Sequence, residues 1–289
     1  MVRVKFYSGL SIAVCYCLLQ LIVLQWPSAS AKVVVARQTM YDTLSCTSCP
    51  IIVGGSNAIY GIRSKILTHD MGLNRTGRTI LNMALISEGY SSSNYAAWLA
   101  HLHNDPTFIV YSTITLYSLT KSKVSYYGNR KLGGEANRIE LFSPERLITK
   151  LLGTEATWDF DVHGDLRTYD CSPAIVPADF GAFDEEAADR FFQDVQTLRS
   201  IYPKAKMLLR IPPALVQSRQ RQDWDHYFSQ LASFSRAKGY YGLFLQSMPR
   251  LFTSKEYFCD TAFHPNKEYS EKLSHELARH VLMRLSSER

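Results

Sequence analysis

Short apolar runs alternate with longer amphipathic segments along most of the chain. The apolar runs have the length and composition of buried strands, and we expect strands at Pro50–Gly54, Ile80–Leu85, Phe108–Ser112, Ala205–Ile211 and Gly242–Gln246. Segments with the apolar spacing of a helix predict helices at Asn57–Leu67, Ser92–His103, Glu185–Ile201, Asp223–Lys238 and Glu268–Ser286. This order predicts an α/β fold with three α/β/α layers, because parallel strands of a central sheet need crossover connections that helices supply.

The middle of the chain, about residues 119–181, breaks this alternation. It contains Gly133-Gly134, several other turn formers and one segment that favours a helix, Pro144–Leu152. We interpret it as an insertion in a single α/β domain that spans residues 48–289. A chain of 289 residues with 46% hydrophobic residues is long enough to bury the core of such a domain.

A serine, Ser56, stands where the first expected strand turns into the first helix. Gly54 and Gly55 precede it and permit a tight turn with unusual backbone angles. The first N–H groups of a helix have no partner inside the helix, so they can stabilise an oxyanion beside this serine. A serine at this place is also a common helix N-cap, and the residue alone does not separate the two roles.

An acid and a histidine, Asp260 and His264, follow the last expected strand and precede the last helix. Functional side chains of an open parallel sheet gather beyond the carboxyl ends of its strands, which is where Ser56 also lies. We expect His264 to act as the general base for Ser56 and Asp260 to orient the imidazole. Asn266 is expected to cap the last helix. Surface roles are expected for most of the other histidines, His69, His101, His103, His163, His226, His275 and His280.

These two blocks resemble those of the SGNH (GDSL-like) hydrolases. The first reads Gly54-Gly55-Ser56-Asn57, with glycine in place of the usual aspartate, and the second ends in His264-Pro265-Asn266. Three residues separate Asp260 from His264, where the common family pattern has two, so the loop must bulge if both are to reach. The resemblance implies a flavodoxin-like sheet of the SGNH hydrolase type and a catalytic set of Ser56, Asp260 and His264.

The resemblance also implies where an oxyanion hole would lie. Its donors would be the N–H groups of Ser56, Asn57 and Gly89, the last after the second strand. The asparagine that the family supplies after the third strand is missing here. Either Ser112 or Thr113 substitutes for it, or two backbone donors suffice. These departures leave open an alternative, a catalytically silent carbohydrate-binding or scaffold protein of a polysaccharide export complex.

The N-terminus has the pattern of a secretory signal. Arg3 and Lys5 precede an apolar run at residues 10–24, and Ala29-Ser30-Ala31 follows as a small-residue cleavage site. We therefore expect residues 1–31 to be a signal peptide, or an uncleaved anchor through residues 10–24. In both cases the remainder would be exported, to the periplasm or beyond.

Cysteine usage agrees with export. Four cysteines follow the signal, and four cysteines allow three pairings. We favour structural disulfides, because the strand-like run after Cys46 and Cys49 does not suit a redox motif, and no histidine pair suits a zinc site. Cys171 is predicted to pair with Cys259, since that link would steady the loop of Asp260. Cys46 and Cys49 would then pair or remain free.

Charge and the remaining motifs restrict the classes of substrate and partner that we expect. The formal charge of +6 and the pI near 8.9 do not reach the clustered basic footprint of nucleic-acid binders, so no nucleic acid is expected. The G-G-S-N block, the export signal and the H-P-N ending resemble the exported branch of the family, which adds or removes acyl groups on bacterial polysaccharides. We therefore expect a serine esterase or O-acetyltransferase without cofactor or metal. Its partners would be a carbohydrate or other ester and, in addition, polysaccharide-synthesis membrane proteins.

One alternative concerns the class of substrate. A phospholipid or small-ester hydrolase is the nearest enzymatic rival. The insertion mixes aromatic and charged residues that suit sugar binding or ordinary loop packing equally well: Tyr126, Tyr127, Trp158, Tyr169, Arg130, Lys131, Asp159 and Asp161.

Overall fold

The computed structural model describes residues 29–44, 46–85, 99, 105–112, 159–169, 171, 175, 177, 183–218, 221–246 and 250–287. The N-terminal apolar run at 10–24 and the helix expected at Pro144–Leu152 lie outside these ranges, and so does the helix expected at Ser92–His103 apart from Leu99.

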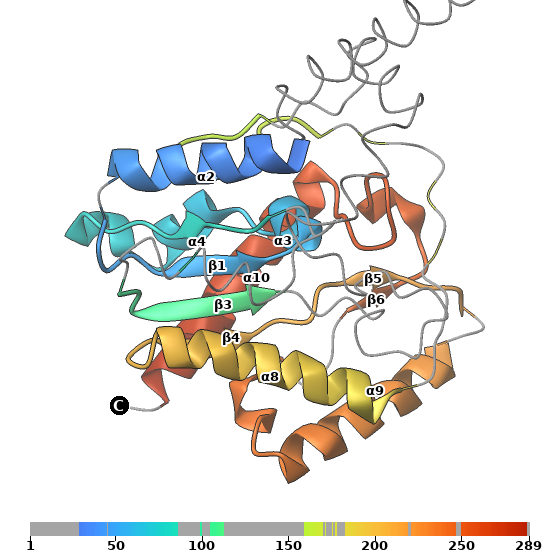
Figure 1. The fold of residues 1–289 in the computed structure, drawn as a ribbon. Helices are drawn as coiled ribbons and strands as arrows, with labels where there is room; N and C mark the ends of the chain where they lie inside the picture. Colours follow the sequence, from blue (N-terminus) through green and yellow to red (C-terminus); the bar gives the residue numbers. More distant parts are fainter. Residues whose placement is uncertain are drawn as a thin grey trace, which may run out of the picture.

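The centre of the molecule is a four-stranded parallel sheet (Figure 1). Its strands stand in the order β2-β1-β3-β4, and their bounds are Leu81–Asn82, Ile51–Gly54, Phe108–Ser112 and Lys206–Leu209 respectively. This sheet, flanked by helices, confirms the predicted α/β fold. The order reverses between β1 and β3, which is the point where open sheets of this kind place their sites.

Two sets of helices cover the sheet, and alternate residues of each strand face one set or the other. The helices are α3 (Ser56–Gly61), α4 (Ser64–Asp70), α8 (Glu185–Ile201), α9 (Arg221–Ala237) and α10 (Lys267–Ser286). Ile52, Val110 and Leu208 pack with the buried residues of α3, α4 and α10, and α10 passes behind the strands in Figure 1. The alternate strand residues pack with α8 and α9.

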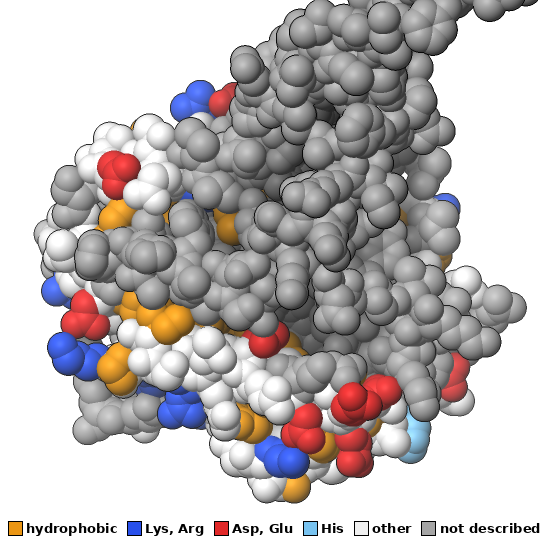
Figure 2. Space-filling view, in the orientation of Figure 1, with side chains coloured by type: hydrophobic (Ala, Val, Ile, Leu, Met, Phe, Trp, Pro, Cys, Tyr) orange, Lys and Arg blue, Asp and Glu red, His pale blue; other side chains and the backbone are white. Residues whose placement is uncertain are grey.

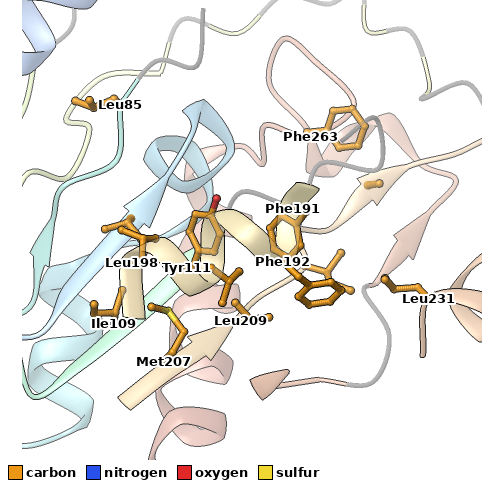
Figure 3. Packing of buried hydrophobic residues seen from close by; sticks show 14 of the residues in the cluster. Leu85, Ile109, Tyr111, Phe191, Phe192, Leu198, Met207, Leu209, Leu231 and Phe263 are labelled. Atoms are coloured by element: carbon orange, nitrogen blue, oxygen red, sulfur yellow. The ribbon is translucent and has the colours of Figure 1, made fainter. Parts of the chain in front are cut away.

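The α8 side of the sheet holds an aromatic core (Figure 3). Tyr111 of β3 stacks on Phe191 of α8, with ring centroids 5.5 Å apart. Phe263, the residue before His264, belongs to the same buried cluster and is 7% exposed. The loop that carries His264 is therefore anchored in the main core.

Helix α8 carries its charges where its dipole favours them. Glu185 and Glu186 lie in its first turn and Arg199 in its last, and the Asp184 side chain accepts hydrogen bonds from the N–H groups of Glu186 and Ala187. Figure 2 shows acidic side chains gathered over the α8–α9 end of this face and basic ones toward the other end. Such placement stabilises the helix ends.

The helix expected at Asn57–Leu67 is two helices, α3 and α4, and this part of the prediction is wrong. The backbone is extended at Ile62 and Arg63. Asp165, a buried residue of the predicted insertion, accepts hydrogen bonds from the N–H groups of Ser64 and Lys65 at 2.7 and 2.9 Å, and so begins a second helix. A cap supplied from about 100 residues away leaves no signal in the local pattern.

The strand expected at Gly242–Gln246 is also absent from the sheet as a regular strand. Only Phe244 forms a parallel bridge, to Leu209. A 3₁₀ helix, η4 (Tyr241–Leu243), occupies the start of this run, and its turn bonds use backbone groups that a strand ladder would need. The run therefore continues the sheet at a single position.

Other elements were not predicted. A second, two-stranded parallel sheet joins β5 (Ala214–Leu215) to β6 (Leu251–Phe252), and two-residue strands are too short to show a period. Helix α2 (Ala29–Leu44) contains the predicted cleavage site and precedes the predicted start of the domain at residue 48. Its Arg37 and Met40 are buried. Within the described ranges, no helix is long and apolar enough to cross a membrane.

Two disulfides close the fold. Cys171 is bonded to Cys259, which confirms the predicted pairing across 88 residues, and Cys46 is bonded to Cys49. Disulfides are typical of exported proteins, because the cytosol keeps thiols reduced.

Candidate active site

Ser56 is the first residue of α3, directly beyond the carboxyl end of β1. Gly54, two residues before Ser56, has φ 155°. A Cβ atom there would stand 2.4 Å from the Ser112 carbonyl oxygen of β3. Only glycine allows this close approach of the two central strands. Gly55 has φ −93°, which other residues adopt readily, so only one of the two glycines has the unusual backbone that was expected.

The first turn of α3 presents free backbone donors. The first N–H of the turn with a backbone partner is that of Ala58, which donates to the Gly55 carbonyl at 2.9 Å. The backbone N–H groups of Ser56 and Asn57 donate to no acceptor in the described part of the chain. These are the groups expected to form an oxyanion hole. The third expected donor, Gly89, lies outside the described residues, as does Thr113.

The structure brings Ser56, His264 and Asp260 together in one hydrogen-bonded row. His264 Nε2 lies 2.9 Å from Ser56 Oγ, and His264 Nδ1 lies 2.7 Å from Asp260 Oδ1. The His264 side chain is 12% exposed and the Asp260 side chain 31%. With Nδ1–H donating to the carboxylate, Nε2 is left to accept the serine proton.

A turn absorbs the extra residue between Asp260 and His264. The Phe263 N–H donates to Thr261 Oγ1 at 3.2 Å, and the Cys259 N–H donates to the His264 carbonyl at 2.8 Å. Phe258 and Pro265 form an antiparallel bridge at its base. The loop therefore bulges as the spacing required, and acid and base still meet.

Contacts on both sides hold this loop in place. Cys259 is tied to Cys171, and the Leu215 N–H of β5 donates to the Ala262 carbonyl at 2.8 Å. Asn266 caps α10, because its Oδ1 accepts a hydrogen bond from the Tyr269 N–H at 2.9 Å. The predicted role of Asn266 is thereby confirmed.

A buried arginine, Arg210, follows β4 and was not anticipated. It donates hydrogen bonds to Ser112 Oγ at 3.3 Å and to the Gly61 carbonyl at 3.4 Å, and burial lowers its pKa to about 10. None of the carboxylates in the described ranges forms an ion pair with it. Ser112, one of the two suggested substitutes for the family asparagine, is fully buried and held by this guanidinium. A lone arginine after a strand carries no signal that reveals such a contact.

An aromatic ring, Tyr60, also escaped the sequence analysis. It lies flat on the His264 imidazole, with ring centroids 4.2 Å apart and an angle of 3° between the planes. The one signal in the sequence was its position four residues after Ser56, since residues at that spacing share one helix face.

Most other residues considered for the site have structural contacts elsewhere. His163 bonds to Thr79, His275 to Asp70 and His280 to Gln246. The described members of the aromatic and charged set are Tyr169, Asp159 and Asp161. Outside the described residues lie His101, His103, Tyr126, Tyr127, Trp158, Arg130 and Lys131.

The three described members of the aromatic and charged set make contacts within the fold. Tyr169 packs on Tyr60, with ring centroids 5.4 Å apart, Asp159 pairs with Arg167, and Asp161 accepts the N–H groups of its own turn. Burial raises the pKa of Tyr169, which keeps its hydroxyl protonated as a hydrogen-bond donor.

The arrangement has the parts needed for acyl transfer. It combines a serine hydroxyl, an imidazole within reach of its proton, a carboxylate on the other ring nitrogen, and unpaired amides at a helix start. Across the described residues, no three metal-ligating side chains cluster in a way that would hold a metal ion.

No protein-family model matches the chain, and no curated protein matches it. It is similar in structure to a solved carbohydrate esterase, whose active site is described as having divergent catalytic and non-catalytic binding functions. The two are 11% identical with a TM-score of 0.40, over 82% of this chain and 65% of that chain. A likeness at this level implies neither activity nor substrate.

Proposed function

We propose that this chain is an exported serine esterase or O-acetyltransferase that acts on acyl groups of a cell-surface or extracellular polysaccharide. The observation that carries the proposal is the row of hydrogen bonds from Asp260 through His264 to Ser56. Ser56 is 204 residues before Asp260 in the sequence, yet the three side chains meet in the order that acyl transfer requires.

The chemistry follows from the atoms in that row. Ser56 Oγ attacks the acyl carbonyl carbon while His264 Nε2 takes the serine proton, and the carbonyl oxygen becomes an oxyanion. The amides of Ser56 and Asn57 stabilise that charge. His264 then returns the proton to the departing sugar oxygen, which leaves the acyl group on Ser56. Water or a second sugar hydroxyl, activated by His264 in the same way, takes the acyl group and frees the enzyme.

The choice of carbohydrate ester rests on the resemblance of the G-G-S-N and H-P-N blocks to the exported branch of the SGNH family. Export is supported by the two disulfides, which persist in oxidising compartments. The same site could process a phospholipid or a small ester, so the substrate is tested apart from the chemistry.

Labelling with a fluorophosphonate probe tests the chemistry. We expect the probe to modify Ser56 in the wild-type chain and in a Ser200→Ala control, whose serine is exposed on α8. Ser56→Ala should neither be labelled nor hydrolyse a small acetyl ester, while its melting temperature stays close to that of the wild type. A catalytically silent scaffold would leave the wild-type chain unlabelled, and that result would refute the proposal.

Incubation with an acetylated polysaccharide then tests the substrate and the acceptor. Release of free acetate indicates an esterase, and movement of label from a donor ester to sugar hydroxyls indicates a transferase. Turnover of a phospholipid with no turnover of any acetylated glycan would contradict the carbohydrate assignment.

A further inference from the structure

The ring of Tyr60 covers one face of the His264 imidazole. The planes are 3° from parallel with centroids 4.2 Å apart, and Tyr60 is 6% exposed. Neither hydrogen bond of the imidazole involves this ring, since Asp260 and Ser56 occupy its two nitrogens. Tyr60 therefore contacts the base through its π face.

Helix α3 fixes the ring relative to the nucleophile. Tyr60 comes four residues after Ser56, so both side chains lie on the same side of the helix, one turn apart. A flat stack blocks movement and tilting of the imidazole toward the Tyr60 ring. The two ring nitrogens therefore keep pointing toward Asp260 and Ser56, which lie at the edges of the imidazole.

A second aromatic residue supports the stack from behind. Tyr169 meets Tyr60 edge to face at 5.4 Å, and its hydroxyl donates to the Tyr60 carbonyl at 3.0 Å. Arg63 donates to the Tyr169 hydroxyl at 3.3 Å, and Ser270 of α10 lies 3.1 Å from it. Tyr60 is thus held by its own helix and by Tyr169, and not only by its contact with His264.

The charge of the imidazole changes during the reaction, and a π face responds to that change. When His264 takes the Ser56 proton it becomes a cation, and a cation over an aromatic face is stabilised by the ring quadrupole. An uncharged imidazole gains much less from the same stack. An interaction that grows only as the proton moves lowers the barrier and leaves substrate binding unchanged.

We propose that Tyr60 is a positioning residue for the reaction, which holds the plane of the His264 imidazole and stabilises its cationic form through the ring face. This inference rests on the proposed function, since it assigns His264 the role of general base. It predicts that the electron density of the ring at position 60, and not only its shape, sets kcat.

Replacement of the ring tests the proposal. Tyr60→Leu should lower kcat about tenfold at unchanged KM, and Tyr60→Phe, which keeps the ring face, should remain within about threefold of the wild type. Tyr240→Leu is the matched control. Tyr240 stacks on Phe192 at 4.3 Å and 4°, and that stack belongs to the core on the other side of the sheet. The control should lower the melting temperature without lowering kcat of the folded protein.

A series of fluorinated phenylalanines at position 60 separates charge from shape. Each added fluorine withdraws electron density from the ring face with little change of volume, so log kcat should fall in step with the number of fluorines while KM and the melting temperature hold. If kcat does not change across the fluorinated series, the proposal is refuted. This test remains valid even if Tyr60→Leu fails to fold. A wild-type chain that is neither labelled nor active would refute the proposed function and this inference together. An active wild-type chain whose kcat is the same in all position-60 variants would refute this inference alone.

Discussion

His264 is the residue of the candidate site with the most contacts in the row. It has a different partner on each ring nitrogen and a ring on one face, so contacts restrain it both within its plane and toward Tyr60. Asp260 is more exposed than His264, and in the proposed mechanism it acts only through the imidazole. A residue that works through another loses its effect when the other is removed.

The first prediction follows from that dependence. We expect His264→Ala to lower kcat/KM by about 10⁴-fold or more, and Asp260→Asn by a similar or somewhat smaller factor. The double variant should be scarcely worse than His264→Ala, because residues that serve one proton transfer fail together. Steady-state kinetics of the three variants on an acetyl ester measure this. Effects that multiply would mean that the two residues act independently.

At the scale of elements, the start of α4 depends on one carboxylate from a distant segment. Asp165 accepts hydrogen bonds from the Ser64 N–H, the Ser64 hydroxyl and the Lys65 N–H, and it is buried. Burial raises the pKa of Asp165 above its ordinary value of 3.8. Between that value and the raised pKa, the folded chain holds a proton that the unfolded chain has released.

The second prediction follows from this carboxylate. Asp165→Ala should lower the free energy of unfolding by about 2–3 kcal/mol, since the helix loses its cap and buried donors lose their acceptor. Asp165→Asn should cost less, because the amide oxygen still accepts a bond. Asp165 should contribute a loss of stability as pH rises through the window above 3.8, and the Asn variant should lack that contribution, so the two chains should differ in pH slope there. Urea unfolding at several pH values checks both expectations, and an equal pH slope in the two chains would contradict the second.

The two disulfides differ in the length of chain they close, and the third prediction uses that difference. The Cys171–Cys259 bond spans 88 residues and the Cys46–Cys49 bond spans three. In the chain-entropy model, replacement of the first pair by serine should cost roughly 3–5 kcal/mol, and replacement of the second pair much less. Urea unfolding without reductant compares the two double variants. Equal losses would show that the long link does not act by restricting the unfolded chain.

At the scale of the whole molecule, the parts that sequence predicts well are those whose signal is local. Helix α8 begins and ends where its pattern indicated, because its period and its Asp184 cap lie within the helix and its flank. The row of Ser56, Asp260 and His264 could be proposed because Ser56 directly follows the first strand, and Asp260 and His264 stand between the last apolar run and the last helix. Tyr60, Arg210 and Asp165 could not be identified in this way.

Their roles depend on which distant segments touch them. The role of Tyr60 depends on the loop that places His264 against its ring. The role of Arg210 depends on Ser112 and Gly61, which accept its hydrogen bonds. The same reason explains the missed break between α3 and α4, since its cap comes from the insertion. The local sequence pattern therefore predicts helices, strands and the residues at strand ends. Contacts between segments far apart in the sequence can be identified only from the three-dimensional structure.

The last prediction concerns the point where fold and site meet. Gly54 lies at the end of β1, paired with Ser112 of β3 in the middle of the sheet, two residues before Ser56. A Cβ at Gly54 would stand 2.4 Å from the Ser112 carbonyl oxygen, which is backbone and cannot move aside without separating the two central strands. We expect Gly54→Ala to lower the free energy of unfolding by about 3 kcal/mol or more.

The matched control is Gly77→Ala. Gly77 has φ 68°, and a Cβ atom there would have no other atom within 4 Å, so its variant bears only the backbone cost of a left-handed residue, about 1–2 kcal/mol. Urea unfolding should therefore separate the two variants. Because Gly54 also sets the place of Ser56, its variant should lose kcat even at temperatures where it is fully folded, whereas the Gly77 variant should not. Equal stability losses, or full activity in folded Gly54→Ala, would show that the junction of β1 and β3 does not position the nucleophile.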